Sequence, residues 1–370
     1  MFRLAIANLV QNKTRLLISV GGVALALTLV LFFRAVFDGA EGRLTVYIDR
    51  AGADVWVSQE GVRTMHMSES ALPASVAEEV RALPGVEEAV PILYTEGMIE
   101  ANGSDYIVYL FGVPVGAPLG GPSLVSESAP EPQSGQIVID HAVASEAGLG
   151  LGDQVTALGQ QLTIAGLTSG TSSLVSSVSF VSMEDFAAVR GGGDVVSFVL
   201  VKIEQGESPA AISSRIAETV PGVTVQTGPE FASQERKLVK DMSADIITIM
   251  NTAGYLTGLA VVALTIYIAT VGRRREYGVL KAMGVRNSRL YWIVLVQALL
   301  TVGIGLLAGL GLTLLLSAVI PSFNELIVLS VSMNSLVRVT AVSAIIACIS
   351  ALLPARQLAG LEPVAIIRRG

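Results

Sequence analysis

The segment LYWIVLVQALLTVGIGLLAGLGLTLLLSAVI, Leu290–Ile320, contains no charged residue over 31 positions. About 20 predominantly apolar residues are enough for a helix to cross the hydrocarbon core of a bilayer. A backbone in lipid must satisfy its own hydrogen bonds, so each such segment predicts a helix. Three other segments have the same character, and the sequence therefore predicts four transmembrane helices. The other three are Leu16–Phe33, Ile246–Val271 and Met333–Leu353, the last with Arg338 near one end.

The composition also indicates a chain that lies largely in lipid. Apolar residues make up 52% and charged residues 15% of the 370 positions, whereas soluble domains carry roughly 25% charged residues. The single cysteine, Cys348, lies within an apolar run and excludes an intramolecular disulfide. A signal peptide is the alternative for the first run, but 18 apolar residues are long for one. Arg34 also stands where a small-residue cleavage site is expected.

Basic residues predict the orientation of the chain. The segment before the first span, the loop 273–289 and the tail 354–370 together carry 12 basic and two acidic residues. The positive-inside rule places all three in the cytoplasm. Residues 38–240 carry 26 acidic and 10 basic residues, and phosphate would repel so acidic a domain, which argues against a nucleic-acid partner. The predicted organisation is 1–15 cytoplasmic amphipathic helix, 16–37 first span, 38–240 extracytoplasmic domain, 241–272 second span, 273–289 cytoplasmic loop, 290–320 third span, 321–332 short outer loop, 333–353 fourth span and 354–370 cytoplasmic tail.

The large insert between the first and second spans is predicted to be an α+β domain. Asn102-Gly103 separates two strand-like runs, and both residues tolerate positive φ, so a β-hairpin is expected there. A second hairpin is expected over Gly159-Gln160. A helix followed by Pro-Gly-Val occurs twice, which suggests two lobes of similar build joined by Gly112–Gly135. The other predicted elements are strands at Asp54–Ser58, Ile137–Ile139, Phe198–Ile203 and Val223–Gln226, helices at Leu72–Leu83 and Pro209–Val220, and a helix Phe231–Asp245 that continues into the second span.

The sequence lacks the common catalytic and metal-binding motifs. His66 and His141 have no Cys or His at metal-ligand spacing, so a surface or hydrogen-bonded role is the simpler interpretation of each. HExxH and GxSxG are absent, and Ser169–Ser179, without a basic partner nearby, is expected to be a flexible loop. The phosphate-binding motif GxxxxGK[ST] is also absent, so this chain is not expected to hydrolyse ATP. The spans carry no central charge, which argues against a proton- or sodium-driven carrier.

Two small-residue motifs lie within the predicted spans. Gly254-x-x-x-Gly258 and Gly305-x-x-x-Gly309 each place glycines on one helix face. Such faces allow helices to approach closely in lipid. Packing within one chain and packing between two copies both remain open from the sequence.

The loop RRREYGVLKAMGVR, Arg273–Arg286, has the most specific pattern in the chain. Tyr277, Leu280 and Lys281 recur at helical spacing and predict a short amphipathic helix, which Gly284 is placed to end. A helix of this kind can lie on anionic headgroups, dock into a groove on a partner, or act only as a positively charged anchor.

This loop resembles the hallmark R-R-x-E-x-G-x-L-[RK]-A-x-G of the FtsX-like permease family, which includes MacB-type ABC permeases, although the usual spacer before the glutamate is missing. The tail Pro354–Arg368 resembles the close of these proteins, and Met1–Arg15 looks like their amphipathic N-terminal helix. Gly135–Asp140, followed by LGLGD at Leu149–Asp153, is similar to the pattern of their outer domain.

The resemblance implies a permease subunit that couples ATP hydrolysis by a separate ABC ATPase to movements of its outer domain. ATP and Mg²⁺ would be bound by that ATPase, and no cofactor is expected in this chain. The resemblance also implies a second permease copy, an extracytoplasmic adaptor or substrate protein, and a place in the bacterial cytoplasmic membrane with both termini inside. The residues that would couple to the ATPase are Arg274, Glu276, Tyr277, Gly278, Leu280, Lys281 and Gly284.

Three functions are compatible with these patterns. The leading one is export or extraction of a lipid, lipoprotein, peptide or hydrophobic drug. The alternative is a regulator in which the same movements drive an extracytoplasmic cell-wall hydrolase. A third, an enzyme without an obvious motif, would require an Asp or Ser activated by residues that the sequence does not reveal.

Overall fold

A computed structural model describes residues 13–66, 68–125, 129–172, 177–190, 192–272, 274–323 and 329–359. The chain forms two compact units. Of the described residues, those up to Gly39, those of Ser243–Phe323 and those from Leu329 onward form the helical unit, and those of Ala40–Met242 form the sheet unit. The predicted N-terminal helix before Lys13, Arg273 of the loop and the tail after Ala359 lie outside the described residues.

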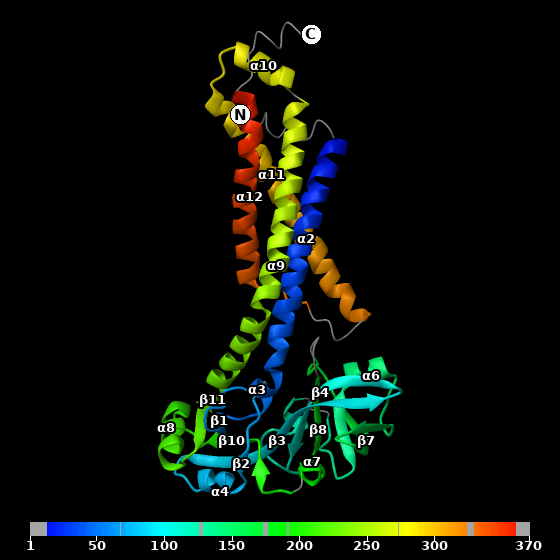
Figure 1. The fold of residues 1–370 in the computed structure, drawn as a ribbon, viewed down its shortest axis with the longest axis vertical. Helices are drawn as coiled ribbons and strands as arrows, with labels where there is room; N and C mark the ends of the chain where they lie inside the picture. Colours follow the sequence, from blue (N-terminus) through cyan, green and yellow to red (C-terminus); the bar gives the residue numbers. More distant parts are fainter. Residues whose placement is uncertain are drawn as a thin grey trace. The chain divides into compact units, whose positions relative to one another are not determined.

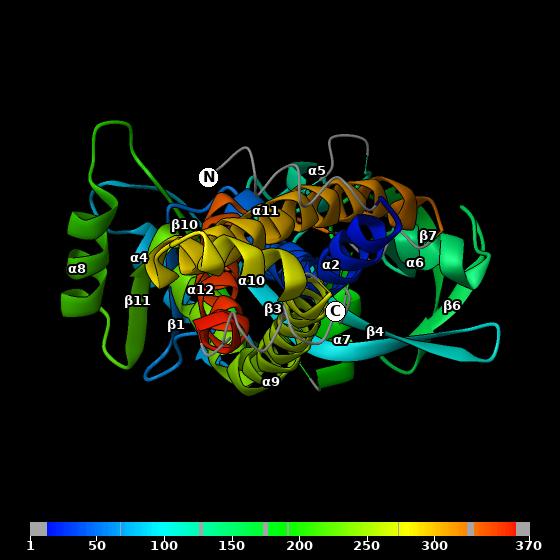
Figure 2. The same cartoon turned by 90° about the horizontal axis from the view of Figure 1, so that it is seen from above.

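Long apolar helices make up most of the helical unit, as Figures 1 and 2 show. They are α2 (Lys13–Leu44), α9 (Gly228–Val271), α11 (Asn287–Val319) and α12 (Met333–Ala359), joined by the short α10 (Arg274–Ala282) and a 3₁₀ turn at Ile320–Ser322. Among the described residues, three helices are long and apolar enough to cross a membrane: Leu16–Arg43, Asn287–Val319 and Met333–Leu352. The apolar stretch of α9, Thr248–Leu264, is shorter. Three of the four predicted spans therefore meet this length and composition, and the second predicted span lies in α9.

Side chains from all four long helices meet in one apolar cluster. Val23 and Leu27 of α2, Val262 of α9, Val302 of α11 and Val339 of α12 are buried in it. In lipid such helices are held together by close packing and hydrogen bonds rather than by removal of apolar surface from water. The small side chains at helix contacts therefore determine how closely the helices of this unit pack.

A nine-stranded sheet is the centre of the sheet unit. Its strands are β1 (Val55–Gln59), β3 (Val86–Ala101), β4 (Ser104–Val113), β5 (Gln136–Asp140), β6 (Gln154–Ala157), β7 (Gln160–Thr168), β8 (Ser177–Ser182), β10 (Phe198–Ile203) and β11 (Val223–Thr227). Their order is β11-β1-β10-β3-β4-β8-β5-β7-β6. The pairs β4–β8 and β5–β7 are parallel, and the other neighbours are antiparallel. The short strands β2 (Leu72–Pro73) and β9 (Val195–Val196) form a separate pair.

The sheet has two halves, each with its own helices. Helices α4 (Ser75–Arg81) and α8 (Pro209–Thr219) pack on the half that contains β1 and β11, and α6 (His141–Ala147) and α7 (Met183–Arg190) pack on the half that contains β4, β5 and β8. The short helices α3 (Val46–Arg50) and α5 (Pro122–Val125) complete the unit. The second half is inserted within the first. The 16-residue strand β3 joins them by pairing with β10 and then with β4, so the prediction of lobes joined by Gly112–Gly135 is wrong.

Both predicted hairpins of this unit are present, the first with the predicted turn residues. Asn102 and Gly103 both have positive φ and connect β3 to β4 in a two-residue hairpin. The second hairpin turns over Leu158-Gly159, one residue earlier than expected, and Leu158 itself takes a positive φ of 54°. The predicted helix Leu72–Leu83 is shorter, because Leu72 and Pro73 pair with β9 before α4 begins.

Candidate functional site

Helix α10 occupies the loop predicted to couple to a partner, and its sequence determines where the helix ends. Gly284 follows the helix with a φ of +84°, a conformation that glycine adopts without strain. Gly284 N donates to Lys281 O at 3.0 Å and Val285 N donates to Leu280 O at 3.1 Å. These two bonds form a Schellman motif, which satisfies carbonyl groups that the helix end leaves free. Gly284 therefore ends α10, as the sequence predicts.

One face of α10 is packed against the helical unit. Tyr277 is 2% exposed and belongs to the same buried cluster as Leu290 and Ile293 of α11. Leu280 and Val285 pack against this cluster, and Gly278 is buried. Two residues predicted to contact a partner, Tyr277 and Leu280, thus hold α10 to its own chain.

The opposite face of α10 is exposed. Val279 and Met283 lie one helical turn apart and are 46% and 68% exposed. Glu276 is also exposed, and Lys281 is half-buried. Val279 and Met283 are absent from the residues predicted to couple, although their i, i+4 spacing is the signal that identifies them. An exposed apolar pair on a short helix with charged neighbours is suited to a partner surface.

The four glycines of the small-residue motifs all face α2 of the same chain. A Cβ built on Gly254 of α9 would overlap Val30, and one on Gly258 would lie 3.8 Å from Ala26 Cβ. From α11, a Cβ on Gly305 would lie 2.6 Å from Val23 Cγ1.

Gly309 brings α11 still closer to the backbone of α2. A Cβ on it would lie 3.0 Å from Ala24 O, and Thr28 Oγ1 donates to Gly309 O at 3.4 Å. Both motifs therefore mark intramolecular contacts with one central helix, α2.

A polar cluster connects α2 to the start of α12. Asp38 Oδ2 accepts hydrogen bonds from Ser332 Oγ at 2.7 Å and Ser335 Oγ at 2.6 Å. Arg34 Nε donates to Ser335 Oγ at 3.1 Å, and Ser330 N donates to Ala35 O at 2.9 Å. Because Ser335 is buried, these bonds fix the register of α12 on α2 in addition to the apolar contacts.

The first turns of α9 are held firmly by the sheet unit. Thr227 N donates to Glu230 Oε2 at 3.0 Å, and Glu230 N donates to Thr227 Oγ1 at 3.4 Å. This reciprocal pair is a capping box that starts the helix. One turn later the Phe231 ring stacks on Trp56 with centroids 4.7 Å apart.

The carboxylate of Glu235 is fully buried on the same face of α9. Its Oε2 accepts a hydrogen bond from Met65 N at 2.7 Å, and its Oε1 pairs with His66 Nδ1. His66 is thus a buried, hydrogen-bonded residue rather than a surface one. Burial of a carboxylate is tolerated when both oxygens have partners, as here. Within the described ranges, no three His, Cys, Asp or Glu residues are grouped so as to hold a metal ion.

Comparison with known proteins gives two family matches. The FtsX-like permease C-terminal model matches residues 248–363, and the MacB-like periplasmic core domain model matches residues 16–219. An uncharacterized ABC transporter permease of Mycobacterium tuberculosis is 21% identical over 360 residues, which are 97% of each chain. The probable export ATP-binding/permease protein MacB of Pseudomonas entomophila is 24% identical over 401 residues, which cover all of this chain and 58% of that protein.

A solved structure also resembles part of the chain. The periplasmic region of MacB from Actinobacillus actinomycetemcomitans superimposes with a TM-score of 0.38 and 13% identity, over 50% of this chain and 94% of that one. The two family models cover more than half of the sequence in the order seen in the structure, helix, α+β unit, then helices. The chain belongs to the FtsX-like permease family and is an ABC transporter permease of the MacB type.

Proposed function

We propose that this permease is driven by a separate ABC ATPase that docks on α10. The observation that carries the proposal is the two-faced packing of this helix. Tyr277 fixes α10 to the helical unit, while Val279 and Met283 remain exposed one turn apart. Because α10 is anchored, a displacement of the bound ATPase would also move the helices next to α10. A loosely attached loop would move without displacing them.

The relatives support a separate ATPase. The MacB relative is named an export ATP-binding/permease protein, and the chain spans 58% of its length. The mycobacterial relative is named a permease only and matches over 97% of both chains. Because the present sequence has no phosphate-binding loop, ATP and Mg²⁺ are assigned to the partner.

We assign α2, α9, α11 and α12 as four membrane spans, with α9 crossing through its apolar stretch Thr248–Leu264 and adjoining residues. The basic loop around α10 and both termini lie in the cytoplasm, and the sheet unit lies outside the bacterial cytoplasmic membrane. This orientation follows from the 12 basic and two acidic residues of the three short segments. The family name of the matched core domain, periplasmic, agrees with it.

The activity proposed is export or extraction of an apolar or amphipathic cargo. Relatives are named for macrolide export and for syringafactin export. A second copy of the permease completes the assembly, and the two outer domains move when the ATPase binds ATP. Cargo is expected to contact the sheet unit.

Affinity purification of the full chain in mild detergent tests the docking proposal. A soluble protein that contains GxxxxGK[ST] is expected to co-purify with the chain. Met283→Glu is expected to reduce its recovery at least about tenfold, because a charge placed in an apolar contact loses hydration. Ser288→Glu adds the same charge at an exposed position just beyond α10 and is the matched control. Equal recovery with both variants would exclude α10 as the docking site.

A further inference from the structure

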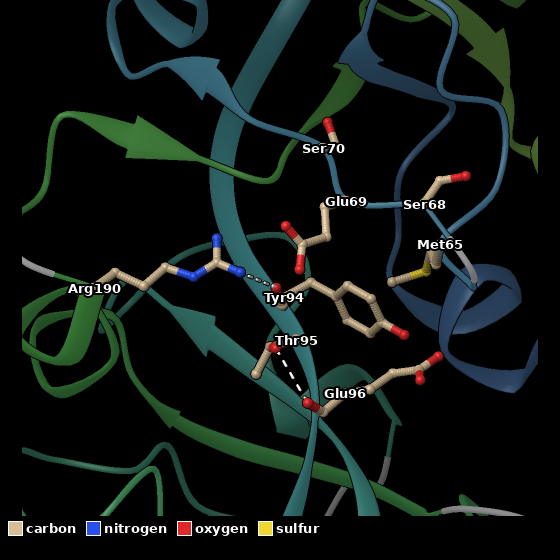
Figure 3. A pocket seen from close by; sticks show the side chains of 8 residues that line it. All are labelled: Met65, Ser68, Glu69, Ser70, Tyr94, Thr95, Glu96 and Arg190. Atoms are coloured by element: carbon tan, nitrogen blue, oxygen red, sulfur yellow. Dashed lines mark hydrogen bonds between the residues drawn. The ribbon is translucent and has the colours of Figure 1, made fainter.

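A pocket of about 290 Å³ opens in the sheet unit beside strand β3 (Figure 3). It is lined by the segment that follows β1, by β3 and by the end of α7. At about 30 Å³ per water, a ligand of roughly ten non-hydrogen atoms fills such a volume. Two carboxylates, Glu69 and Glu96, and several hydroxyl groups line it. Arg190 is the single basic residue among the described lining residues.

Arg190 is oriented by the protein around it. Its Nη2 donates to Tyr94 O at 3.1 Å and its Nη1 donates to Ser197 Oγ at 3.5 Å. The guanidinium carbon also lies 5.4 Å from the centre of the Phe186 ring. The position of Arg190 at one side of the pocket is therefore fixed. The other two charged residues that line the pocket, Glu69 and Glu96, are both negative.

Tyr94 supplies a second and independent sign of a ligand. Its side chain is 93% buried, and among the described residues its hydroxyl has no hydrogen-bond partner. Figure 3 shows its ring directed toward Met65 and Glu96. A buried hydroxyl without a partner costs free energy, which a ligand that donates or accepts a hydrogen bond would recover.

The wall opposite β3 is set in place before a ligand arrives. Met65 lines the pocket, and its N–H is bonded to the buried Glu235 of α9. His66 next to it pairs with the other oxygen of the same carboxylate. A wall fixed in this way lowers the entropy lost on binding.

We propose that this pocket binds an organic ammonium ion that carries a small apolar body. The ammonium group donates to Glu69, Glu96 and the Tyr94 hydroxyl, and the apolar body contacts Met65 and the Tyr94 ring. A cation near an aromatic ring gains further attraction from the ring face. The inference deepens the proposed export function by naming a ligand class. It does not depend on the ATPase, since binding is measured without it.

Calorimetric titration of the full chain in nanodiscs of zwitterionic lipid, at physiological salt, tests the site. The probe is phenethylammonium, and its neutral isostere 2-phenylethanol is the control ligand. The cation is expected to bind at least about fivefold more tightly. Replacement of both carboxylates, Glu69→Gln with Glu96→Gln, is expected to weaken its binding about fivefold to tenfold. Tyr94→Phe is expected to weaken it about threefold.

Glu100→Gln separates a specific site from the general field of this acidic domain. Glu100 is exposed on the same strand and does not line the pocket, so binding is expected to stay within about twofold of the unchanged protein. In a Trp292→Phe background, the emission of buried Trp56 confirms that each variant is folded. Equal affinity for both probes, or an equal loss with Glu100→Gln, would overturn the proposal. Loss of ATPase docking with intact probe binding would instead count only against the coupling role of α10.

Discussion

Among the described residues of the sheet unit, Glu235 and Asp140 are the two acidic residues that are buried. Glu235 is paired across a long distance in sequence. It is fully buried, and its two oxygens are matched by Met65 N and His66 Nδ1. These partners lie far away in sequence, and one of them is a backbone amide. Only the folded chain reveals the pair, because His66 has no partner at recognisable spacing in the sequence.

Removal of this carboxylate leaves two buried donors without an acceptor. Glu235→Ala is therefore expected to lower the free energy of unfolding of the sheet unit by about 2–4 kcal/mol. Gln234→Ala, at the half-exposed neighbouring position, is the matched control and is expected to change it by less than about 0.5 kcal/mol. Urea titration monitored by Trp56 emission, in a Trp292→Phe background, measures both. Equal urea midpoints for Glu235→Ala and Gln234→Ala would show that the hydrogen bonds of Glu235 contribute nothing to stability.

Tyr94 links protonation to stability in the same region. Burial raises the pKa of its hydroxyl above the ordinary value of 10, with smaller contributions from Tyr109, Glu96 and Glu235. The unfolded chain thus releases this proton first as pH rises. The contribution of Tyr94 to the free energy of unfolding is fully present below pH 10. Above pH 10 it decreases by about 1.4 kcal/mol per pH unit.

Tyr94→Phe is accordingly expected to make the free energy of unfolding fall less steeply with pH between about pH 10 and 11.5. The same urea titration, repeated at several alkaline pH values, gives the slope. Tyr106→Phe, at a half-buried tyrosine of β4, serves for comparison. An unchanged slope in Tyr94→Phe would contradict the assigned cause.

At the scale of elements, α2 is the helix on which α9 and α11 pack. Sequence patterns identify Gly254, Gly258, Gly305 and Gly309 but not their shared partner. Which helix a small face meets depends on the arrangement of the whole bundle, and a GxxxG motif contains no such information. The same limit applies to β2, whose short pairing with β9 overrides the helical pattern of its residues.

Substitution of these glycines tests the arrangement around α2. Gly305→Leu inserts a side chain where a Cβ already lies 2.6 Å from Val23 Cγ1, so it is expected to cost at least about 1–3 kcal/mol. Gly303→Leu places the same side chain two residues earlier, where a Cβ has no neighbour within 4 Å. Thermal challenge followed by size-exclusion chromatography in detergent is expected to show a loss of about 4 °C or more for Gly305→Leu alone. Equal losses would mean that α11 does not pack on α2 through Gly305.

For the whole molecule, the sequence predicts the order of its parts well. Uncharged runs such as Leu290–Ile320 identify spans, and Asn102-Gly103 identifies a hairpin, because each depends on local chemistry alone. The insertion of one half of the sheet within the other was not predictable, since it rests on strand β3 pairing with both β10 and β4. The loop motif located α10, but only its packing separates the anchoring Tyr277 from the exposed Val279 and Met283.

Site-specific photo-crosslinking in intact cells tests the central claim, that α10 docks a separate ATPase. Benzoyl-phenylalanine is placed at position 283, 279 or 277 of the full chain, and the crosslinked proteins are identified by mass spectrometry. We expect positions 283 and 279 to capture a protein that contains GxxxxGK[ST], and the buried position 277 to capture none. Crosslinks from 283 and 279 to lipid alone, or an ATPase captured equally from 277, would contradict the account.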